Sequence, residues 1–131
     1  MNKRTEMREN AALALYQIEL IEITKEEAIE NVCEISNQFL EDLIDGVMKY
    51  TKELDEYLTN NLKNWKLDRI SILDKQIMRL AVFELLHTET PDIVCINEAI
   101  ELSKKYSDDN MPKVVNGVLD SIASKKDNGI N

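Results

Sequence analysis

Residues 71–86 read SILDKQIMRLAVFELL, and this segment is predicted to form the central core helix of the protein. Its apolar residues recur at intervals of three and four, so they fall on one broad face of a helix. They are Leu73, Ile77, Leu80, Ala81 and Leu85. Ser71 followed by Asp74 matches the pair of side chains that caps a helix N-terminus. A helix from about Ser71 to Leu86 is therefore expected.

The same helical spacing continues upstream, and no part of the chain alternates apolar and polar residues for long enough to predict a strand. Helices are expected over about residues 3–20, 25–36 and 37–62. Thr24 and Glu27 form a capping box before the second of them. The residues that this second helix is expected to bury are Ala28, Ile29, Val32 and Ile35.

The third helix has the clearest apolar stripe but also two weak points. Gly46 and Thr51 have low helix propensity, so a bend can occur there. The segment 63–67 that follows has no helical periodicity, and we interpret it as a hinge between two halves of the chain. Trp65, a large aromatic residue within it, is expected to pack the two halves together.

Downstream of the central helix the sequence predicts two more helices. Residues 88–91, Thr-Glu-Thr-Pro, should end the central helix, because proline disfavours helical geometry in the residue before it. A fifth helix should follow and end near Tyr106. Asn110 then starts a sixth, with Pro112 in its first turn. From Lys125 onward the chain is expected to fray.

Together these segments predict an all-α protein of about six to seven helices. Residues 1–131 are expected to form a single domain, since a chain of this length hides roughly two-thirds of its unfolded surface and needs no disulfide or metal to fold. Within that domain we expect an N-terminal helical half over residues 1–62 and a C-terminal helical half over residues 67–125.

The composition is typical of a soluble globular protein, with 44% hydrophobic and 31% charged residues. The N-terminus has no apolar leader, and no segment approaches the roughly 18 apolar residues of a membrane span. No membrane contact and a cytoplasmic location are therefore expected. Cys33 and Cys95 form no CxxC pattern and are expected to be reduced core residues.

The net charge of −9 is distributed unevenly along the chain. Residues 17–45 hold nine acidic residues against one base, Lys25, so this span carries −8 and the remainder −1. Such a balance opposes nonspecific binding to duplex DNA but allows a local basic patch. Lys3, Arg4 and Arg8 lie on the first turns of the first helix, where the two arginines share a face. A pair of this kind is more often a solvated surface than a binding site.

A second basic run has a local net charge of +3, since five bases are opposed by Asp68 and Asp74. The bases are Lys63, Lys66, Arg69, Lys75 and Arg79. Tyr16 lies among small apolar residues, and its pattern fits either a core position or an exposed phenol that meets a partner.

Motifs for catalysis and cofactor binding are absent from the sequence. There is no GxxxxGK[ST] or GxGxxG loop for phosphate, and no serine or cysteine in a nucleophile motif. His87, the one histidine, falls at the end of the central helix, where a cation would favour the helix C-terminus. We therefore expect no enzymatic activity, no metal and no cofactor.

Four blocks of sequence, taken in order, resemble the NusB family. They are RENAALALY at 8–16, LDRISILDKQIMRLAVFELL at 67–86, INEAIELSK at 96–104 and VNGVLD at 115–120. Four blocks in the right order make a much more specific match than any single one. Residues 17–45 resemble the family only in their helical character.

The resemblance implies two helical bundles side by side and a non-catalytic role in bacterial transcription antitermination. It implies binding of boxA-type single-stranded RNA of ribosomal RNA transcripts, together with the small-subunit ribosomal protein NusE, in an RNA polymerase antitermination complex. Tyr16 and Asp74 match positions that meet the ribosomal protein, which is basic and would suit an acidic surface. The residues that match RNA-binding positions are Lys3, Arg4, Arg8, Asn110, Lys113 and Val114.

Three other interpretations compete with this one. A helix-turn-helix DNA regulator needs a basic recognition helix, which Asp74 and Glu84 oppose in the candidate segment. An acidic protein-binding adaptor without an RNA role would use residues 17–45 as its working face. NusB-like domains also occur fused to RNA methyltransferases, for which 131 residues leave no room. The oligomeric state is not specified by the sequence.

Overall fold

The computed structural model describes residues 3–127, and within this range the chain is entirely helical, without a strand. The helices are α1 (Lys3–Ile21), α2 (Lys25–Val32), α3 (Gln38–Asn61), the short 3-10 helix η1 (Leu67–Arg69), α4 (Ile72–His87), α5 (Asp92–Tyr106) and α6 (Met111–Asp127). The prediction of an all-α fold with six to seven helices is confirmed.

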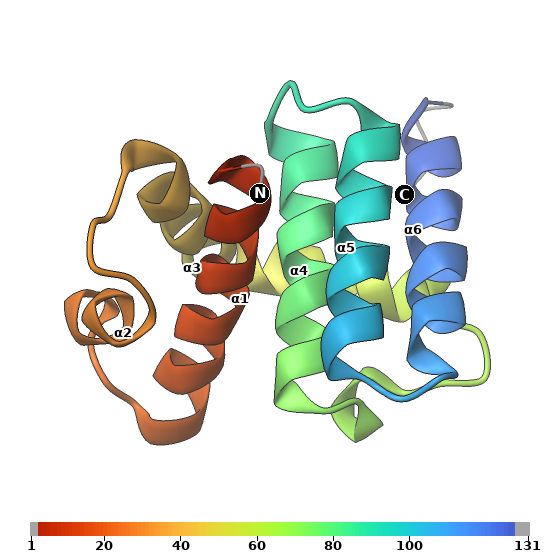
Figure 1. The fold of residues 1–131 in the computed structure, drawn as a ribbon. Helices are drawn as coiled ribbons and strands as arrows, with labels where there is room; N and C mark the ends of the chain where they lie inside the picture. The colour runs from red at the N-terminus through yellow and green to blue at the C-terminus, as the bar shows by residue number, and fades with distance from the viewer. Residues whose placement is uncertain (1–2, 128–131) are drawn as a thin grey trace.

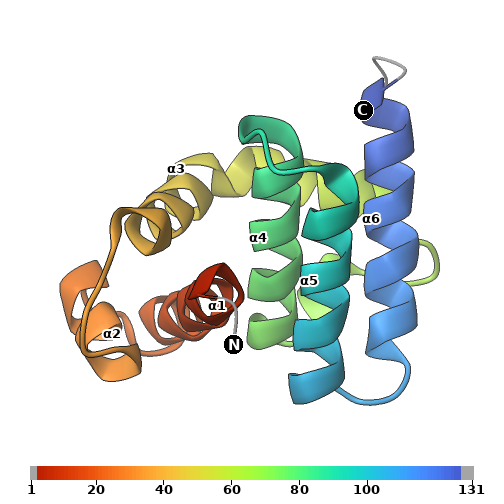
Figure 2. The same ribbon diagram turned by 45° about the horizontal axis from the view of Figure 1, so that its top comes forward.

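The helices form two adjoining bundles (Figure 1). In one, α1 packs against both α2 and α3; in the other, α4, α5 and α6 run antiparallel. Figure 2 shows α3 crossing from the first bundle to the second, where it contacts both α4 and α6. Buried residues from both bundles belong to one continuous hydrophobic core. No described helix is long and apolar enough to cross a membrane.

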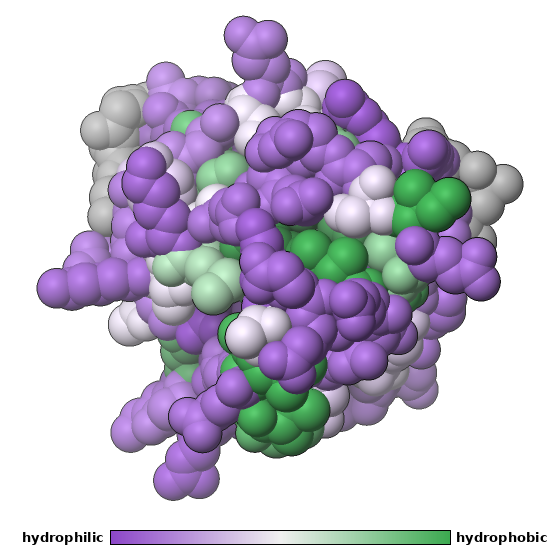
Figure 3. Space-filling model, turned by 90° about the vertical axis from the view of Figure 1, so that its left-hand side faces the viewer, coloured by the Kyte–Doolittle hydropathy of each residue, from purple (hydrophilic) through white to green (hydrophobic). Residues whose placement is uncertain are grey.

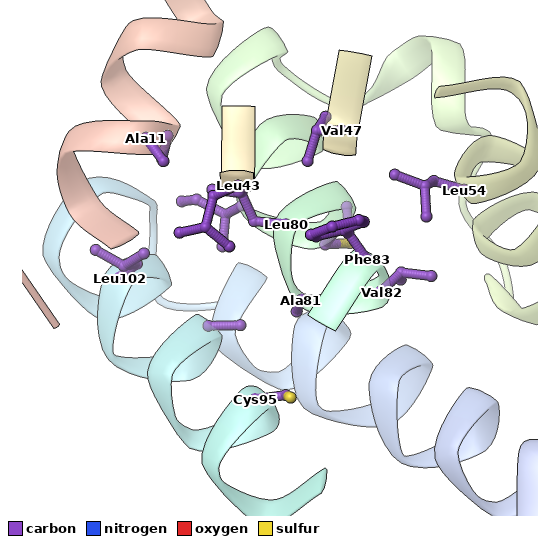
Figure 4. Packing of buried hydrophobic residues seen from close by; sticks show 14 of the residues in the cluster. Ala11, Leu43, Val47, Leu54, Leu80, Ala81, Val82, Phe83, Cys95 and Leu102 are labelled. Atoms are coloured by element: carbon purple, nitrogen blue, oxygen red, sulfur yellow. The ribbon is translucent and has the colours of Figure 1, made fainter. Parts of the chain in front are cut away.

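Helix α4 lies at the centre of this core, as its sequence predicts. Every residue from Gln76 to Leu85 is buried. In Figure 4, Leu43 and Val47 of α3 lie near Leu80 and Phe83 of α4. Because a helix buried on all sides must contact several neighbours, α4 joins the two bundles.

Gly46 allows α3 and α4 to approach each other closely. A Cβ atom built on Gly46 would lie 2.1 Å from Cζ of the Phe83 ring, so the ring occupies the space of the missing side chain. Helix α3 is continuous through both Gly46 and Thr51. We expected a weak point at this glycine, and the structure instead gives it a packing role.

Three helices begin with side-chain caps. Thr24 Oγ1 accepts a hydrogen bond from the backbone N–H of Glu27 at 3.1 Å, and Ser71 Oγ accepts one from Asp74 at 3.2 Å, as predicted. Asn37 caps α3 in the same way. Such a cap stabilises a helix by about 1 kcal/mol.

Two local predictions were wrong, and a third holds only in part. Helix α2 ends at Val32 rather than at 36, because Cys33 is extended, and Ile35 is 81% exposed instead of buried. Helix α6 does not fray at Lys125 but continues to Asp127, and Lys126 Nζ donates to the Leu85 carbonyl at 3.2 Å. The rest of the predicted frayed tail, residues 128–131, lies outside the described residues. Trp65 lies between the end of α3 and α6, as the prediction of a packing role requires, but its side chain is 40% exposed and so is only partly covered.

Candidate functional site

The start of α1 presents two exposed basic residues, Lys3 and Arg4. The guanidinium of Arg4 lies 4.5 Å from the centre of the Phe39 ring on α3. A cation at this distance from an aromatic face is attracted by about 0.5–1 kcal/mol at an exposed site. This contact holds the Arg4 side chain against α3 at an exposed position.

Arg8, one turn further along α1, is buried and committed to an ion pair. Its Nε and one terminal nitrogen donate to the two carboxylate oxygens of Glu84 on α4, both at 2.8 Å. The side chains of Arg8 and Glu84 are only 5% and 2% exposed. Glu98 of α5 lies 3.7 Å from the other terminal nitrogen. The expectation of a solvated arginine is therefore wrong for Arg8, and its role in RNA binding stays a prediction.

Burial of the Arg8 guanidinium disfavours its charge, but the hydrogen bonds and negative charge of Glu84 outweigh this and raise the pKa of Arg8. The Arg8 guanidinium thus keeps its charge inside the core. The sequence did carry a signal for it: Glu84 interrupts the apolar run LAVFELL, and a buried acid requires a partner.

A groove of about 890 Å³ opens beside the start of α1. It lies between the first turns of α1, α3, and the end of α4 with the following turn. Arg4 and Arg8 are its basic lining residues. Its acidic lining residues are Asp42, Asp45, Glu89 and Glu98. The mixture of charges disfavours this groove as a simple phosphate-binding cleft.

Three rings stack along one wall of this groove. The His87 ring lies 4.1 Å from Tyr50 at an interplanar angle of 11°, and 5.7 Å from Phe83. His87 Nε2 lies 2.5 Å from a carboxylate oxygen of Glu53. His87 is the last residue of α4, as expected, and it packs against α3 through these contacts.

The second predicted RNA-binding group, Asn110, Lys113 and Val114, lies at the start of α6. Lys113 is exposed, whereas Val114 is half-buried and packs against the core. The carboxylate of Asp108, rather than the Asn110 side chain, accepts the backbone N–H groups that open the helix. Figure 1 places the start of α6 at the opposite end of the C-terminal bundle from the start of α1. The structure thus divides the predicted RNA-binding residues into two groups.

The predicted partner-binding residues Tyr16 and Asp74 lie on α1 and α4, two helices in contact with each other. Both side chains are half-buried. One Asp74 oxygen accepts from Ser71 Oγ at 2.9 Å, and the other accepts from Ser107 Oγ. Asp74 therefore holds the start of α4 as well as presenting an acidic surface.

The second basic run is smaller than its sequence suggests. Arg79 is buried, with Asp55 bound through two nitrogens at 2.7 and 2.9 Å and Glu19 at 2.8 Å. Lys75 lies 3.7 Å from Glu19 as well. These contacts connect α1, α3 and α4, so only Lys63, Lys66 and Arg69 of the run remain exposed.

The acidic segment 17–45 covers the side of the molecule that carries α2. Figure 3 shows this side as largely hydrophilic, with hydrophobic patches between the polar residues. Glu26, Glu27 and Glu30 of α2 are exposed, and Lys25 pairs with Asp45 at 3.0 Å. This surface would suit a basic partner.

The described residues contain no cluster of three or more metal-ligating side chains. Cys33 and Cys95 are free thiols, and burial raises the pKa of the Cys95 thiol to about 12. A thiol with such a pKa is protonated at neutral pH and is a poor nucleophile.

These features define a two-bundle, all-helical protein whose candidate contacts lie on open surfaces at helix ends. The chain belongs to the NusB family of transcription antitermination proteins, whose family model matches residues 5–124. It is 46% identical to the transcription antitermination protein NusB of Bacillus subtilis, over 93% of this chain and 95% of the relative. For NusB of Exiguobacterium sp. the identity is also 46%, over 92% and 96%.

Solved structures show the same fold. NusB of T. maritima superposes with a TM-score of 0.83 at 33% identity, covering 95% of this chain and 93% of that one. A structure of the antitermination factors NusB and NusE in complex with double-stranded RNA matches with a TM-score of 0.80 at 27% identity, covering 95% and 98%.

Proposed function

We propose that this protein, acting in the bacterial cytoplasm without catalysis, binds boxA-type single-stranded RNA of ribosomal transcripts together with the ribosomal protein NusE. In this role it would join an RNA polymerase antitermination complex. Family membership supports the proposal, and so does the solved relative that contains NusE and RNA. The observation on this chain that carries it is the exposed basic start of α1, Lys3 and Arg4, which borders a groove that also contains Asp42 and Asp45 of the acidic segment.

The charge distribution explains why a partner would be needed. A protein of net charge −9 repels phosphates at long range, so a few exposed bases give weak RNA binding by themselves. A basic ribosomal protein bound to the acidic surface of residues 17–45, and to the half-buried side chains of Tyr16 and Asp74, would reduce this repulsion. We therefore expect the two-protein complex to bind RNA more tightly than this chain alone.

Removing the two exposed bases of α1 should weaken RNA binding and its dependence on salt. For single strands, the slope of log affinity against log salt changes by about 0.7 per neutralised phosphate, so Lys3→Ala with Arg4→Ala should flatten it by about one unit. The measurement is anisotropy of a labelled boxA-type oligonucleotide, titrated with the complex at several salt concentrations.

Lys52→Ala, at an exposed position on α3, is the matched control and should leave the slope nearly unchanged. An unaltered affinity and slope in the double variant would exclude the start of α1 as the RNA site and favour the adaptor interpretation.

A duplex of the same sequence should compete poorly for the complex. Sequence-specific proteins recognise the edges and faces of unstacked RNA bases, and these are hidden when the bases are paired in a duplex. Equal competition by the duplex would contradict the preference for single strands.

Asp74→Asn should weaken binding of the ribosomal protein by about tenfold or more, because it removes a charge that would face a basic partner. An asparagine retains an oxygen that can accept from Ser71 or Ser107, so the start of α4 should survive. Titration calorimetry measures the affinity, and circular dichroism checks the fold. Glu101→Gln, at an exposed α5 position, is the control. If both variants bind equally well, Asp74 serves only as a helix cap.

A further inference from the structure

A second hollow lies between the end of α3, the segment that follows it, and the first half of α6. Its volume is about 240 Å³, which is below the roughly 300 Å³ of the smallest pockets for drug-sized ligands. A space of this size suits a single flat ring system. Its lining includes Trp65, Lys63, Lys113 and Gly117.

Trp65, the one tryptophan of the chain, forms an exposed aromatic surface in this hollow. The side chain is 40% exposed, although indole is the largest apolar group available for burial. The preceding residue, Asn64, has a left-handed backbone with φ of 65°, a conformation that asparagine tolerates better than most residues. The turn at Asn64 thus fixes the chain immediately before the indole.

Gly117 leaves the facing backbone of α6 uncovered. A Cβ atom at this position would meet nothing within 4 Å, so internal packing does not require glycine here, in contrast to Gly46. Glycine inside a helix is less favourable than alanine, so its presence here has a stability cost that packing does not explain. An exposed helical glycine in the wall of a hollow permits a ligand to approach the backbone closely.

The polarity of the hollow favours a nucleic-acid ligand over a peptide. Lys63 and Lys113 are both exposed, and no carboxylate is found among the described residues that line it. At its base, Asn61 is buried and bonded to Ser121 and to the Tyr57 carbonyl, so it demands no further partner. The larger groove, by comparison, is lined by four carboxylates.

We propose that this hollow binds one unstacked nucleobase of single-stranded RNA, stacked on the indole of Trp65, with Lys63 and Lys113 contacting the neighbouring phosphates. The inference rests on the proposed function and names one subsite of the RNA-binding surface. Aromatic side chains serve this purpose because every base has a π-face that can stack, whereas lysines supply the charge for the backbone.

Trp65→Ala should weaken RNA binding by the two-protein complex about fivefold to a hundredfold, the range that removal of one stacking platform produces. Trp65→Phe should retain most of the affinity. Trp65 is the only tryptophan of this chain, so its fluorescence is the emission of the parental complex minus that of the Trp65→Phe complex. This fluorescence should decrease to a plateau as a boxA-type oligonucleotide is added.

Gly117→Leu gives an independent test that does not alter the aromatic ring. It should place a side chain in the hollow and lower RNA affinity at least fivefold while it raises the thermal stability of the helix. Ser124→Leu, at an exposed α6 position outside the hollow, should leave RNA affinity unchanged.

The outcomes separate this inference from the proposed function. Tight binding by the parental complex, with unchanged affinity in Trp65→Ala and Gly117→Leu and no change in emission, would overturn the subsite and leave the proposed function intact. No RNA binding by the parental complex would overturn both. If Trp65→Ala instead weakens only the ribosomal-protein interaction, the hollow is a protein contact and the nucleobase assignment is wrong.

Discussion

Glu84→Leu should lower the free energy of unfolding by about 3–5 kcal/mol, because it leaves the buried guanidinium of Arg8 without its bidentate partner. Glu98, 3.7 Å away, is more exposed and can compensate only in part. Urea unfolding followed by far-UV circular dichroism measures the loss. An effect below about 1 kcal/mol would mean that the ion pair contributes little beyond its own desolvation.

The double variant Arg8→Met with Glu84→Leu separates the pair's net contribution from the penalty of an unpaired charge. Replacement of both partners by apolar residues of similar volume is often neutral or stabilising, so this variant should be markedly more stable than Glu84→Leu alone. Glu101→Leu, an exposed α5 substitution, controls for added hydrophobicity. The double variant also tests the RNA role of Arg8 in a folded protein: unchanged RNA affinity would show that its charge is not needed there.

Gly46→Ala should destabilise the protein by about 3 kcal/mol, at the upper end of the usual range for an overpacked core. The added Cβ would lie 2.1 to 2.7 Å from three atoms of the Phe83 ring, so α3 and α4 must separate or the ring must move. Thermal and urea unfolding both measure this change.

Gly117→Ala is the matched control, since its Cβ meets open space and alanine should stabilise α6 by up to about 1 kcal/mol. Combining Gly46→Ala with Phe83→Leu should recover part of the loss, because the smaller side chain vacates the occupied space. Equal effects of alanine at the two glycines would refute the close approach of α3 and α4.

The sequence predicted those parts of the fold that depend on local pattern. The stripe in α4 and the caps at Thr24 and Ser71 follow from residues three or four positions apart, whose geometry is set within one helix. The end of α2 was misjudged, because Ile35 continues the apolar spacing while the backbone after Val32 is extended. Helical periodicity does not by itself specify where a helix ends.

The candidate site was harder to predict, since its geometry depends on residues distant in sequence. Arg4 and Arg8 look equivalent on a helical surface, yet Arg8 is buried against an acid 76 residues away while Arg4 stays at an exposed position. The hollow beside Trp65 is formed by the end of α3 and the first half of α6, which no local pattern relates. The size of Trp65 indicated a packing role between the two halves, but it did not indicate that 40% of the side chain stays exposed beside a hollow.

The separation of Arg8 from Glu84 has a consequence for how the protein is made on the ribosome. At about 5–20 residues per second, Glu84 is added about 4–15 s after Arg8, which lies 76 residues earlier. During this interval a nascent α1 has neither the carboxylate nor the apolar surface of α4 to pack against. The N-terminal bundle therefore cannot finish folding during synthesis until α4 has emerged, and the two bundles reach their native packing as one cooperative unit.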